Sequence, residues 1–141
     1  MRRERVLFLC TGNSCRSQMA EGLLKYIAGD RFDVFSAGVN PVQVNPAAIR
    51  VMDEVGIDIS EQRSKSVDSF LGQQFDYVIT LCDNARQTCP ILQGRHVSLH
   101  WSFEDPAIVK GTNEEKMDAF RIIRDAILRK LEGFIKGLSL K

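Results

Sequence analysis

The stretch VLFLCTGNSCRS, residues 6–17, decides how this chain folds. Its first four residues, 6–9, are all apolar, as expected for a parallel strand that is buried on both faces. Five residues then separate Cys10 from Arg16, and Ser17 follows where a helical pattern begins. A strand, a short polar loop and a helix in this order predict an anion-binding loop at the N-terminus of a helix.

The chemistry of this loop suits a tetrahedral oxyanion with a nucleophile beneath it. Backbone N–H groups in such a loop can point inward, and an arginine fork can bind two oxygens at once. These positive surroundings favour the thiolate form of Cys10, and the Ser17 hydroxyl is placed to donate a hydrogen bond to its sulfur. We therefore predict Cys10 as the nucleophile. The predicted oxyanion-binding residues are Thr11, Gly12, Asn13, Ser14, Cys15 and Arg16.

Cys15, inside the loop, has two open interpretations. It is either a bystander that faces the core or the partner of Cys10 in a protective disulfide under oxidation. A zinc site is not expected, because four residues separate Cys10 from Cys15 and six separate Cys82 from Cys89, whereas paired zinc ligands are usually closer.

Strand patterns and helix patterns alternate along the rest of the chain. The predicted strands are 6–9, 34–37, 77–81 and 97–100. Alternation of this kind predicts one three-layer α/β domain over residues 1–141, with a four-stranded parallel sheet in the order 2-1-3-4 and helices on both faces. Ligands of such sheets bind beyond the carboxyl ends of the strands, which is where Cys10 falls.

The helices are predicted from periodicity and end signals. The first begins near Ser17 and ends before Gly29, with an apolar face of Ala20, Leu23, Leu24 and Ile27. The second begins at Asn45-Pro46, runs through Ile49, Met52 and Val55 and stops at Gly56. A short helix covers 67–71. The last begins at a capping box, Thr112 and Glu115, and its core stripe is Met117, Phe120, Ile123, Ile127, Leu131, Phe134 and Leu138.

Composition excludes several function classes. The 141 residues carry 19 basic and 18 acidic side chains, a formal net charge of +1, which argues against nucleic-acid and membrane partners. No apolar run approaches the roughly 20 residues of a bilayer span, and the first run is too short for a signal peptide. We therefore expect a cytoplasmic protein. Thiols stay reduced there, so four cysteines indicate catalytic or redox work.

Three further residues are candidates for the site. Asp105 follows the fourth strand, where it can protonate a leaving oxygen as a general acid or, alternatively, cap a turn. Cys82 ends the third strand, which neighbours the first in the predicted order, so Cys82 and Cys10 lie at the ends of adjacent strands. Cys89 follows seven residues later. A thiol near the nucleophile and another beyond it have the geometry of a relay, the alternative being two unrelated buried cysteines.

These residues together resemble the thioredoxin-coupled arsenate reductases, which share the fold of low-molecular-weight protein tyrosine phosphatases. The phosphatase part of the resemblance is residues 10–17 and Asp105-Pro106. The reductase part is Leu81-Cys82, Cys89-Pro90-Ile91 and His100-Trp101.

The resemblance implies an order of chemical steps. Cys10 attacks arsenate, and Cys82 then attacks Cys10, which releases arsenite and leaves a Cys10–Cys82 disulfide. Cys89 next moves the disulfide to Cys82–Cys89, which thioredoxin reduces. Arsenate is thus the implied substrate, within arsenic resistance, and thioredoxin the external reductant, with no bound cofactor. A glutaredoxin or another dithiol carrier stays open as electron donor, and we expect a monomer.

Two other functions compete with this one. The first is a phosphatase acting on phosphotyrosine or a small phosphoester, but such enzymes usually carry an aromatic residue where Ala107 follows Asp105-Pro106. Minor phosphatase activity is expected even in a reductase, because phosphate and arsenate have the same shape and charge. The second is a non-enzymatic module that binds an oxyanion or senses redox state.

Some of these reductases bind a potassium ion beside the loop. Asn13, Glu21 and Ser36 match three of the ion's ligand positions, but the fourth, an aspartate in the family, is Lys65. An ammonium repels a cation that a carboxylate would attract. We therefore expect no bound metal, with the Lys65 amine taking the ion's place or else pointing into water.

Overall fold

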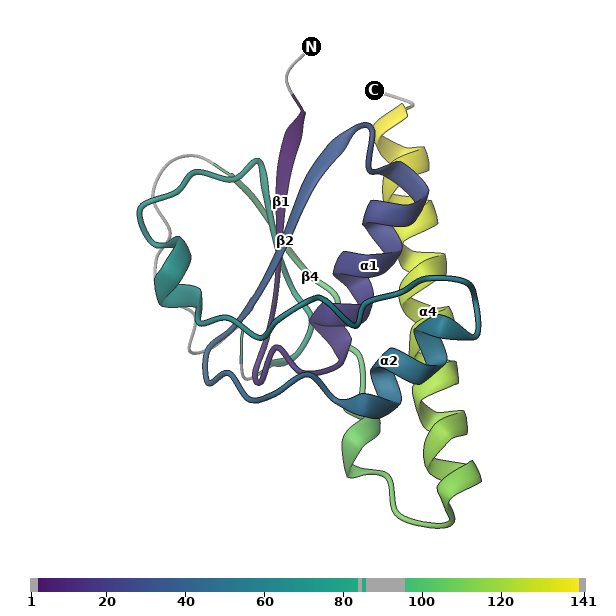
Figure 1. The fold of residues 1–141 in the computed structure, drawn as a ribbon. Helices are drawn as coiled ribbons and strands as arrows, with labels where there is room; N and C mark the ends of the chain where they lie inside the picture. Colours follow the sequence, from purple (N-terminus) through teal and green to yellow (C-terminus); the bar gives the residue numbers. More distant parts are fainter. Residues whose placement is uncertain (1–2, 84, 86–95, 140–141) are drawn as a thin grey trace.

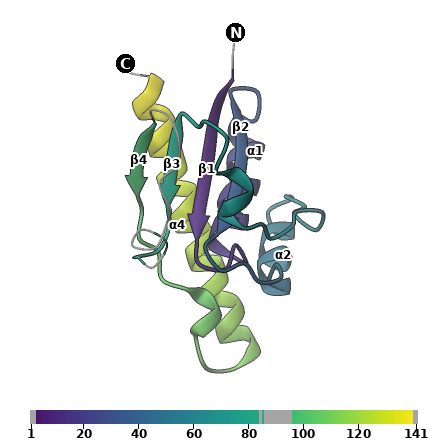
Figure 2. The ribbon, with the colours of Figure 1, turned by 90° about the vertical axis from the view of Figure 1, so that its left-hand side faces the viewer.

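The computed structural model describes residues 3–83, 85 and 96–139. Four parallel strands, seen side by side in Figure 2, form one sheet in the order β2-β1-β3-β4. Their bounds are β1 Glu4–Cys10, β2 Phe32–Gly38, β3 Tyr77–Thr80 and β4 Val97–His100. The predicted fold class and strand order are confirmed, and β1 and β2 are longer than the apolar runs that predicted them.

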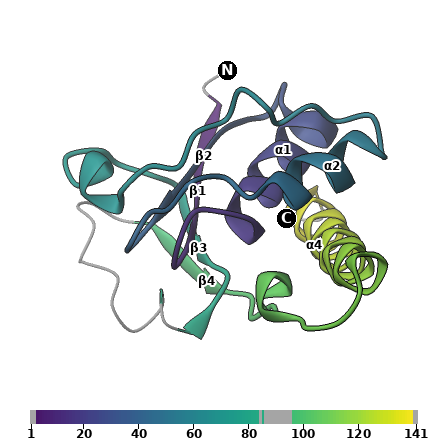
Figure 3. The ribbon, with the colours of Figure 1, turned by 60° about the horizontal axis from the view of Figure 1, so that its bottom comes forward.

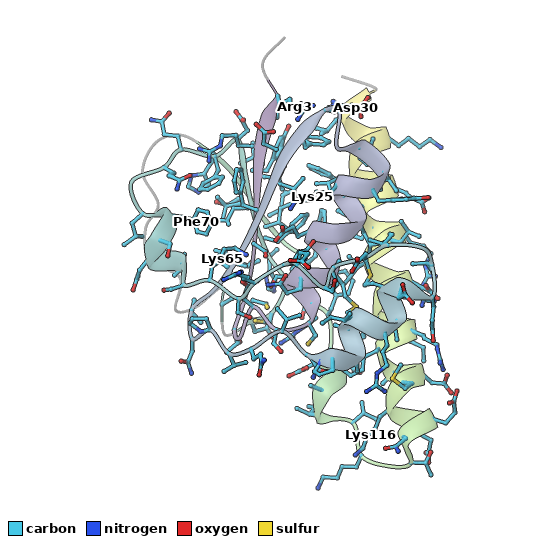
Figure 4. The ribbon with its side chains drawn as sticks, viewed as in Figure 1. Arg3, Lys25, Asp30, Lys65, Phe70 and Lys116 are labelled. Carbon is cyan, nitrogen blue, oxygen red and sulfur yellow. The ribbon has the colours of Figure 1, made fainter. Side chains whose placement is uncertain are left out.

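Helices lie on both faces of the sheet, in three layers (Figure 1). On one face are α1 (Arg16–Ala28), α2 (Pro46–Asp53) and the long α4 (Asn113–Ser139). The other face carries the short 3-10 helix η1 (Val67–Phe70), on which Figure 4 labels Phe70. A second 3-10 turn, η2 (Pro106–Ile108), follows β4 and precedes α4.

Alternate residues of β2 show how the two layers are held. Phe32 faces α4, where its ring centroid lies 6.0 Å from that of Phe134. Phe35 points to the opposite face and packs edge-on against Phe70 and Phe75, at 5.9 and 5.6 Å. Because side chains of a strand alternate between faces, both faces of this strand are covered by aromatic packing.

The helix ends follow the local signals of the sequence. Asn45 accepts the N–H of Ala47 at 2.9 Å at the start of α2. The capping box is formed reciprocally, since Glu115 N–H donates to Thr112 Oγ1 and Thr112 N–H to Glu115 Oε1, both at 3.1 Å. Each such bond satisfies a backbone donor that the helix itself cannot.

One predicted core position and one predicted helix end are wrong. Ile27, placed on the buried face of α1, is 37% exposed, whereas the residues that α1 buries near it are Leu23, Leu24 and Ala28. The second predicted helix is too long, because α2 ends at Asp53 and the chain has already turned toward Gly56, whose φ is +80°. Val55, which the prediction included in that helix, is 43% exposed.

The carboxyl ends of the strands meet at one edge, and the loops that follow them come forward in Figure 3. Cys10 at the end of β1 lies opposite Gly38 at the end of β2. A Cβ on Gly38 would stand 2.7 Å from the carbonyl oxygen of Thr11 and 2.8 Å from the backbone nitrogen of Asn13. Only glycine therefore allows the chain after β2 to pass this close to the loop after β1.

Gly38→Ala should destabilise the protein by about 1–3 kcal/mol, since the clashing atoms are backbone and the loop must shift to accept the methyl group. Urea unfolding measures the change. Gly72→Ala is the control, because a Cβ there meets nothing within 4 Å, and it should change stability by less than about 0.5 kcal/mol. Equal stabilities for the two variants would contradict the close approach.

Candidate active site

The loop between β1 and α1 holds every one of its carbonyl groups away from its centre. The carbonyls of Cys10, Thr11, Gly12 and Ser14 accept N–H groups from the segment 39–45, at 2.8–3.3 Å. The carbonyl of Asn13 accepts the side chains of Gln18 and Ser64, at 3.0 and 2.7 Å. With the carbonyls turned outward, the amide groups of the same peptides face the inside of the loop, as in an anion-binding nest.

Cys10 sits at the base of this loop and is 2% exposed. Its sulfur lies 2.9 Å from Ser17 Oγ. The Asn13 side-chain amide donates to the same oxygen at 2.7 Å, so the Ser17 proton is available for Cys10. The hydroxyl is therefore arranged to stabilise a thiolate, and α1 starts beside it with its N-terminal end.

Arg16 and Asp105 close the other side of the loop. Arg16 is buried, and one of its NH groups donates to the carbonyl of Phe103 at 3.0 Å. Another lies 3.8 Å from an Asp105 carboxylate oxygen. Arg16 Nε is buried and has no hydrogen-bond partner among the described residues, which leaves a charged donor for an oxyanion oxygen.

A cavity of about 250 Å³ opens above the sulfur. It is lined by Cys10, Thr11, Gly12, Ser14, Cys15, Arg16, Asn40, Val42, Asp105 and Ala107. The structure thus brings the predicted nucleophile, arginine and acid to one space. It puts the Asn13 side chain behind the loop, where its amide holds Ser17 and Ser36, so Asn13 can offer an oxyanion only its backbone.

Asn40 and Val42 line the cavity without having been predicted from the sequence. They belong to the segment that supplies N–H groups to the loop carbonyls. The predicted parallel pairing of β1 and β2 could have indicated both residues, because it brings the chain after β2 to the same edge of the sheet as the loop.

Cys15 points toward the acid. Its thiol lies 3.7 Å from Asp105 Oδ1, in position to donate a hydrogen bond. Burial, followed by the charges of Asp105 and Cys10, raises the pKa of Cys15 to about 12. Cys15 therefore remains a neutral thiol at ordinary pH, and its environment differs from the positive one around Cys10.

Asp105 has a second contact that fixes its orientation. Its Oδ1 accepts the N–H of Ala107 at 2.9 Å and caps η2. The capping role and a place in the cavity wall are thus both present, and they are compatible because the carboxylate keeps a second oxygen. Its side chain is one-third exposed, at 33%.

Cys82 lies next to the loop, one residue beyond the last bond that ties its strand to β1. Leu81 N–H donates to the carbonyl of Leu9 at 2.8 Å. The sulfur of Cys82 lies 3.2 Å from Thr11 Oγ1 and accepts the N–H of Ala85 at 3.4 Å. The described cysteines, Cys10, Cys15 and Cys82, are all free thiols, and Cys89 lies outside the described residues.

Glu21 is a buried carboxylate behind the loop, 5% exposed. Its Oε1 accepts the hydroxyl of Ser36 and lies 3.8 Å from Lys65 Nζ, while its Oε2 pairs with Lys25. Lys65 is in the segment that runs from α2 to η1 (Figure 4). Burial lowers the pKa of Lys65, and the charge of Glu21 opposes this shift. Within residues 3–83, 85 and 96–139, no cluster of three His, Cys, Asp or Glu residues suited to a metal occurs.

In chemical terms the site can bind a tetrahedral oxyanion, attack its central atom with a thiolate and protonate a leaving oxygen. The thiolate, the positive donors and the acid surround one cavity. No helix in the part of the chain that the structure describes has the length and apolar character of a membrane span.

Residues 5–141 match the low molecular weight phosphotyrosine protein phosphatase family, and the chain belongs to it. Its curated relatives include an arsenate reductase of Halalkalibacterium halodurans, 49% identical over 95% of this chain and 96% of the relative. Another, from Bacillus subtilis, is 48% identical over 92% of this chain and 93% of its own length. The chain is accordingly a member of the arsenate reductases of that family.

Solved structures agree with this assignment. An arsenate reductase in the oxidized state has a TM-score of 0.81 at 34% identity and covers 95% of this chain and 98% of its own. A thioredoxin-dependent arsenate reductase of Corynebacterium glutamicum has a TM-score of 0.66 at 30% identity, over 95% of this chain and 62% of its own. A tyrosine phosphatase of Erwinia amylovora, at 18% identity and a TM-score of 0.76, shares the fold.

Arg16→Lys should weaken oxyanion binding by about 10- to 100-fold, because an ammonium cannot reproduce the charged fork around the anion. The measurement is protection of Cys10 against iodoacetamide by inorganic phosphate, with the modified residue identified by mass mapping. Arg50→Lys, at an exposed arginine of α2, is the matched control. Undiminished protection in Arg16→Lys would remove Arg16 from the anion site.

Proposed function

We propose that this protein reduces arsenate to arsenite through a relay of Cys10, Cys82 and Cys89, with thioredoxin or a similar dithiol protein as the reductant. The observation that carries the proposal is the contact of Cys82 with the loop, its sulfur 3.2 Å from Thr11 Oγ1. A phosphatase needs the loop, the arginine and the acid, but it has no use for a second thiol at this place.

In the first step, the Cys10 thiolate attacks the arsenic atom of a bound arsenate. An S–As bond forms and one arsenic–oxygen bond breaks, and the oxygen leaves as water with the proton that Asp105 donates. Arg16 and the inward N–H groups stabilise the charge on the remaining oxygens. The hydrogen bond from Ser17 lowers the free energy of the thiolate before the attack.

In the second step, the sulfur of Cys82 attacks the sulfur of Cys10. The new S–S bond forms as the S–As bond breaks, and the electron pair of that bond goes to arsenic. Arsenic(V) becomes arsenic(III), the two thiols are oxidised to one disulfide, and arsenite leaves with the Cys82 proton. Thr11 Oγ1 and the N–H of Ala85 are placed to stabilise the negative charge of the Cys82 thiolate.

In the third step, Cys89 attacks Cys82 and frees the Cys10 thiolate for another cycle. The dithiol of the external protein then reduces the Cys82–Cys89 disulfide. The resemblance of the sequence supports this step, as does the similarity to an arsenate reductase described as thioredoxin-dependent.

Phosphatase activity is a second capacity of the same cavity, because phosphate has the shape and charge of arsenate. The wall at Ala107 is the observation that limits it. A methyl group there gives little surface for an aromatic ring, so we propose no more than slow hydrolysis of small phosphoesters.

Asp105→Asn should slow the first step by about 10²- to 10⁴-fold, since the amide cannot deliver the proton that the leaving oxygen needs. A rapid-quench, single-turnover measurement of arsenite formation reads the effect. Asp118→Asn, on the exposed face of α4, serves as a control for the loss of one carboxylate. A rate within twofold of the parent would contradict the role of Asp105.

The relay itself predicts different fates for the two remaining thiols. Cys82→Ser should bind arsenate and retain any phosphatase activity but release no arsenite, because no sulfur is present to attack Cys10. Cys89→Ser should complete one turnover and stop as a Cys10–Cys82 disulfide, visible by mass mapping of the quenched protein. Cys10→Ser should lose both activities. Continued turnover of Cys89→Ser with thioredoxin alone would refute the relay.

A further inference from the structure

His100, the last residue of β4, makes a hydrogen bond with each of its ring nitrogens. Its Nδ1 lies 2.7 Å from Thr80 Oγ1, and its Nε2 lies 2.9 Å from Asp83 Oδ1. Asp83 directly follows Cys82 in the chain. His100-Trp101 belongs to the resemblance of this sequence to the arsenate reductases, and the chemical steps proposed above leave it without a role.

The hydrogen-bonding capacity of Asp83 and Thr80 determines which ring nitrogens of His100 carry a proton. A carboxylate can only accept, so Nε2 carries a proton in the contact with Asp83. The Thr80 hydroxyl can either donate or accept, and Nδ1 can therefore be bare or protonated. His100 thus holds Asp83 both as neutral imidazole and as imidazolium, and the contact does not depend on one charge state.

The backbone at His100 is held rigidly. His100 pairs with Thr80 in the parallel ladder of β3 and β4. The next residue, Trp101, donates its N–H to the carbonyl of Thr80 at 2.9 Å. Its ring is buried, with centroids 6.4 Å from Phe8 and 5.6 Å from Phe134. A group held this firmly can fix a neighbour that is less firmly held.

The backbone at Cys82 is a neighbour of this less firmly held kind. The ladder to β1 ends at Leu81, whose own carbonyl accepts the N–H of Phe103 at 3.1 Å. Beyond that point, Cys82 packs in the core, and the side-chain hydrogen bonds of 82–83 with described residues are those of the Cys82 sulfur and the pair between Asp83 and His100. The Asp83 side chain is 72% exposed and that of His100 20%, so the pair is accessible and weak enough to reopen.

We propose that His100 is a positioning residue for the second chemical step. By binding the Asp83 carboxylate, it fixes the backbone on the carboxyl side of Cys82 and keeps the Cys82 sulfur beside the loop that holds Cys10. The inference rests on the proposed relay. In-line attack on the Cys10 sulfur needs a narrow range of approach, and limiting the positions of the attacking sulfur raises its effective concentration.

The test isolates that step in a Cys89→Ser parent, in which the proposed relay stops at the Cys10–Cys82 disulfide. After mixing with saturating arsenate, acid quench and mass mapping give the rate of disulfide formation. Asp83→Ala and His100→Ala should each slow it by about two- to fivefold, the effect of losing one exposed pair. The double variant should be no slower than either single variant, because both remove the same contact.

A conservative variant separates positioning from general damage to the fold. His100→Gln keeps an N–H donor near the place of Nε2, so it should recover most of the parent rate. Protection of Cys10 from iodoacetamide by inorganic phosphate should be equal in all variants, because the anion site is untouched. Asp30→Ala is the matched control, since Asp30 is exposed near Arg3 at the opposite end of the sheet (Figure 4).

The outcomes distinguish failure of the relay from failure of the role of His100. A parent that forms no Cys10–Cys82 disulfide overturns the relay, and the role of His100 with it. A parent that forms the disulfide at a rate that Asp83→Ala leaves unchanged overturns the role of His100 alone. Additive slowing by Asp83→Ala and His100→Ala also overturns it, because the residues would then act separately.

Discussion

The anion site depends on the outward direction of the carbonyl groups in the loop that follows β1. Each carbonyl from Cys10 to Ser14 is bonded to a donor outside the loop, four of them to the segment 39–45. A carbonyl turned inward would lose a bond worth about 0.5–1.5 kcal/mol and would repel the oxyanion it faced. The loop that follows β1 is therefore shaped by the chain that follows β2, and Gly38 lets the two come together. The anion-binding loop is therefore built by a pair of strands, although Cys10 and Arg16 both belong to the segment that follows one of them, β1.

Asn13 connects this cradle to the interior. Its φ of +48° is in the left-handed region, which asparagine tolerates better than most residues. Its side chain binds Ser17 and Ser36 and accepts the backbone N–H of Lys65, at 2.7–2.9 Å. The hydroxyl of Ser36 then leads to Glu21, a buried charge that needs cations beside it. Lys25 and Lys65 provide them, so the electrostatic balance of the core reaches the hydroxyl that contacts the nucleophile.

Features with a local cause could be predicted from the sequence. The Asn45 cap and the box of Thr112 and Glu115 are set by residues three positions apart or fewer, and the strands by continuous apolar runs. The order of the strands then brought Cys10, Arg16 and Asp105 to one edge. What could not be predicted depends on tertiary placement. Periodicity put Ile27 on a buried face because it cannot tell which side of each helical turn the neighbouring elements cover. The Asn13 side chain turns away from the anion cavity toward Ser36 and the backbone of Lys65, which are far along the chain. Asp83 likewise contacts a residue 17 positions away, His100.

In the proposed relay, the placement of the two sulfurs gives one sheet edge a rigid first step and an adaptable second step. Cys10 ends β1, which pairs with β2 as far as Cys10 and with β3 as far as Leu9, so the atoms of the proposed first step are preorganised. Continuing the register of Leu9 with Thr80 puts Cys82 beside Thr11, one position past Cys10. With strands about 4.8 Å apart and about 3.3 Å per residue, this diagonal gives a Cα separation of about 6 Å. Disulfides form at Cα separations of about 4.4–6.8 Å, so on this ideal strand geometry the two backbones are within reach of a bond. The proposed Cys10–Cys82 disulfide would then require rotation of the two side chains and a small adjustment of the chain beyond Leu81, with the anion loop left in place.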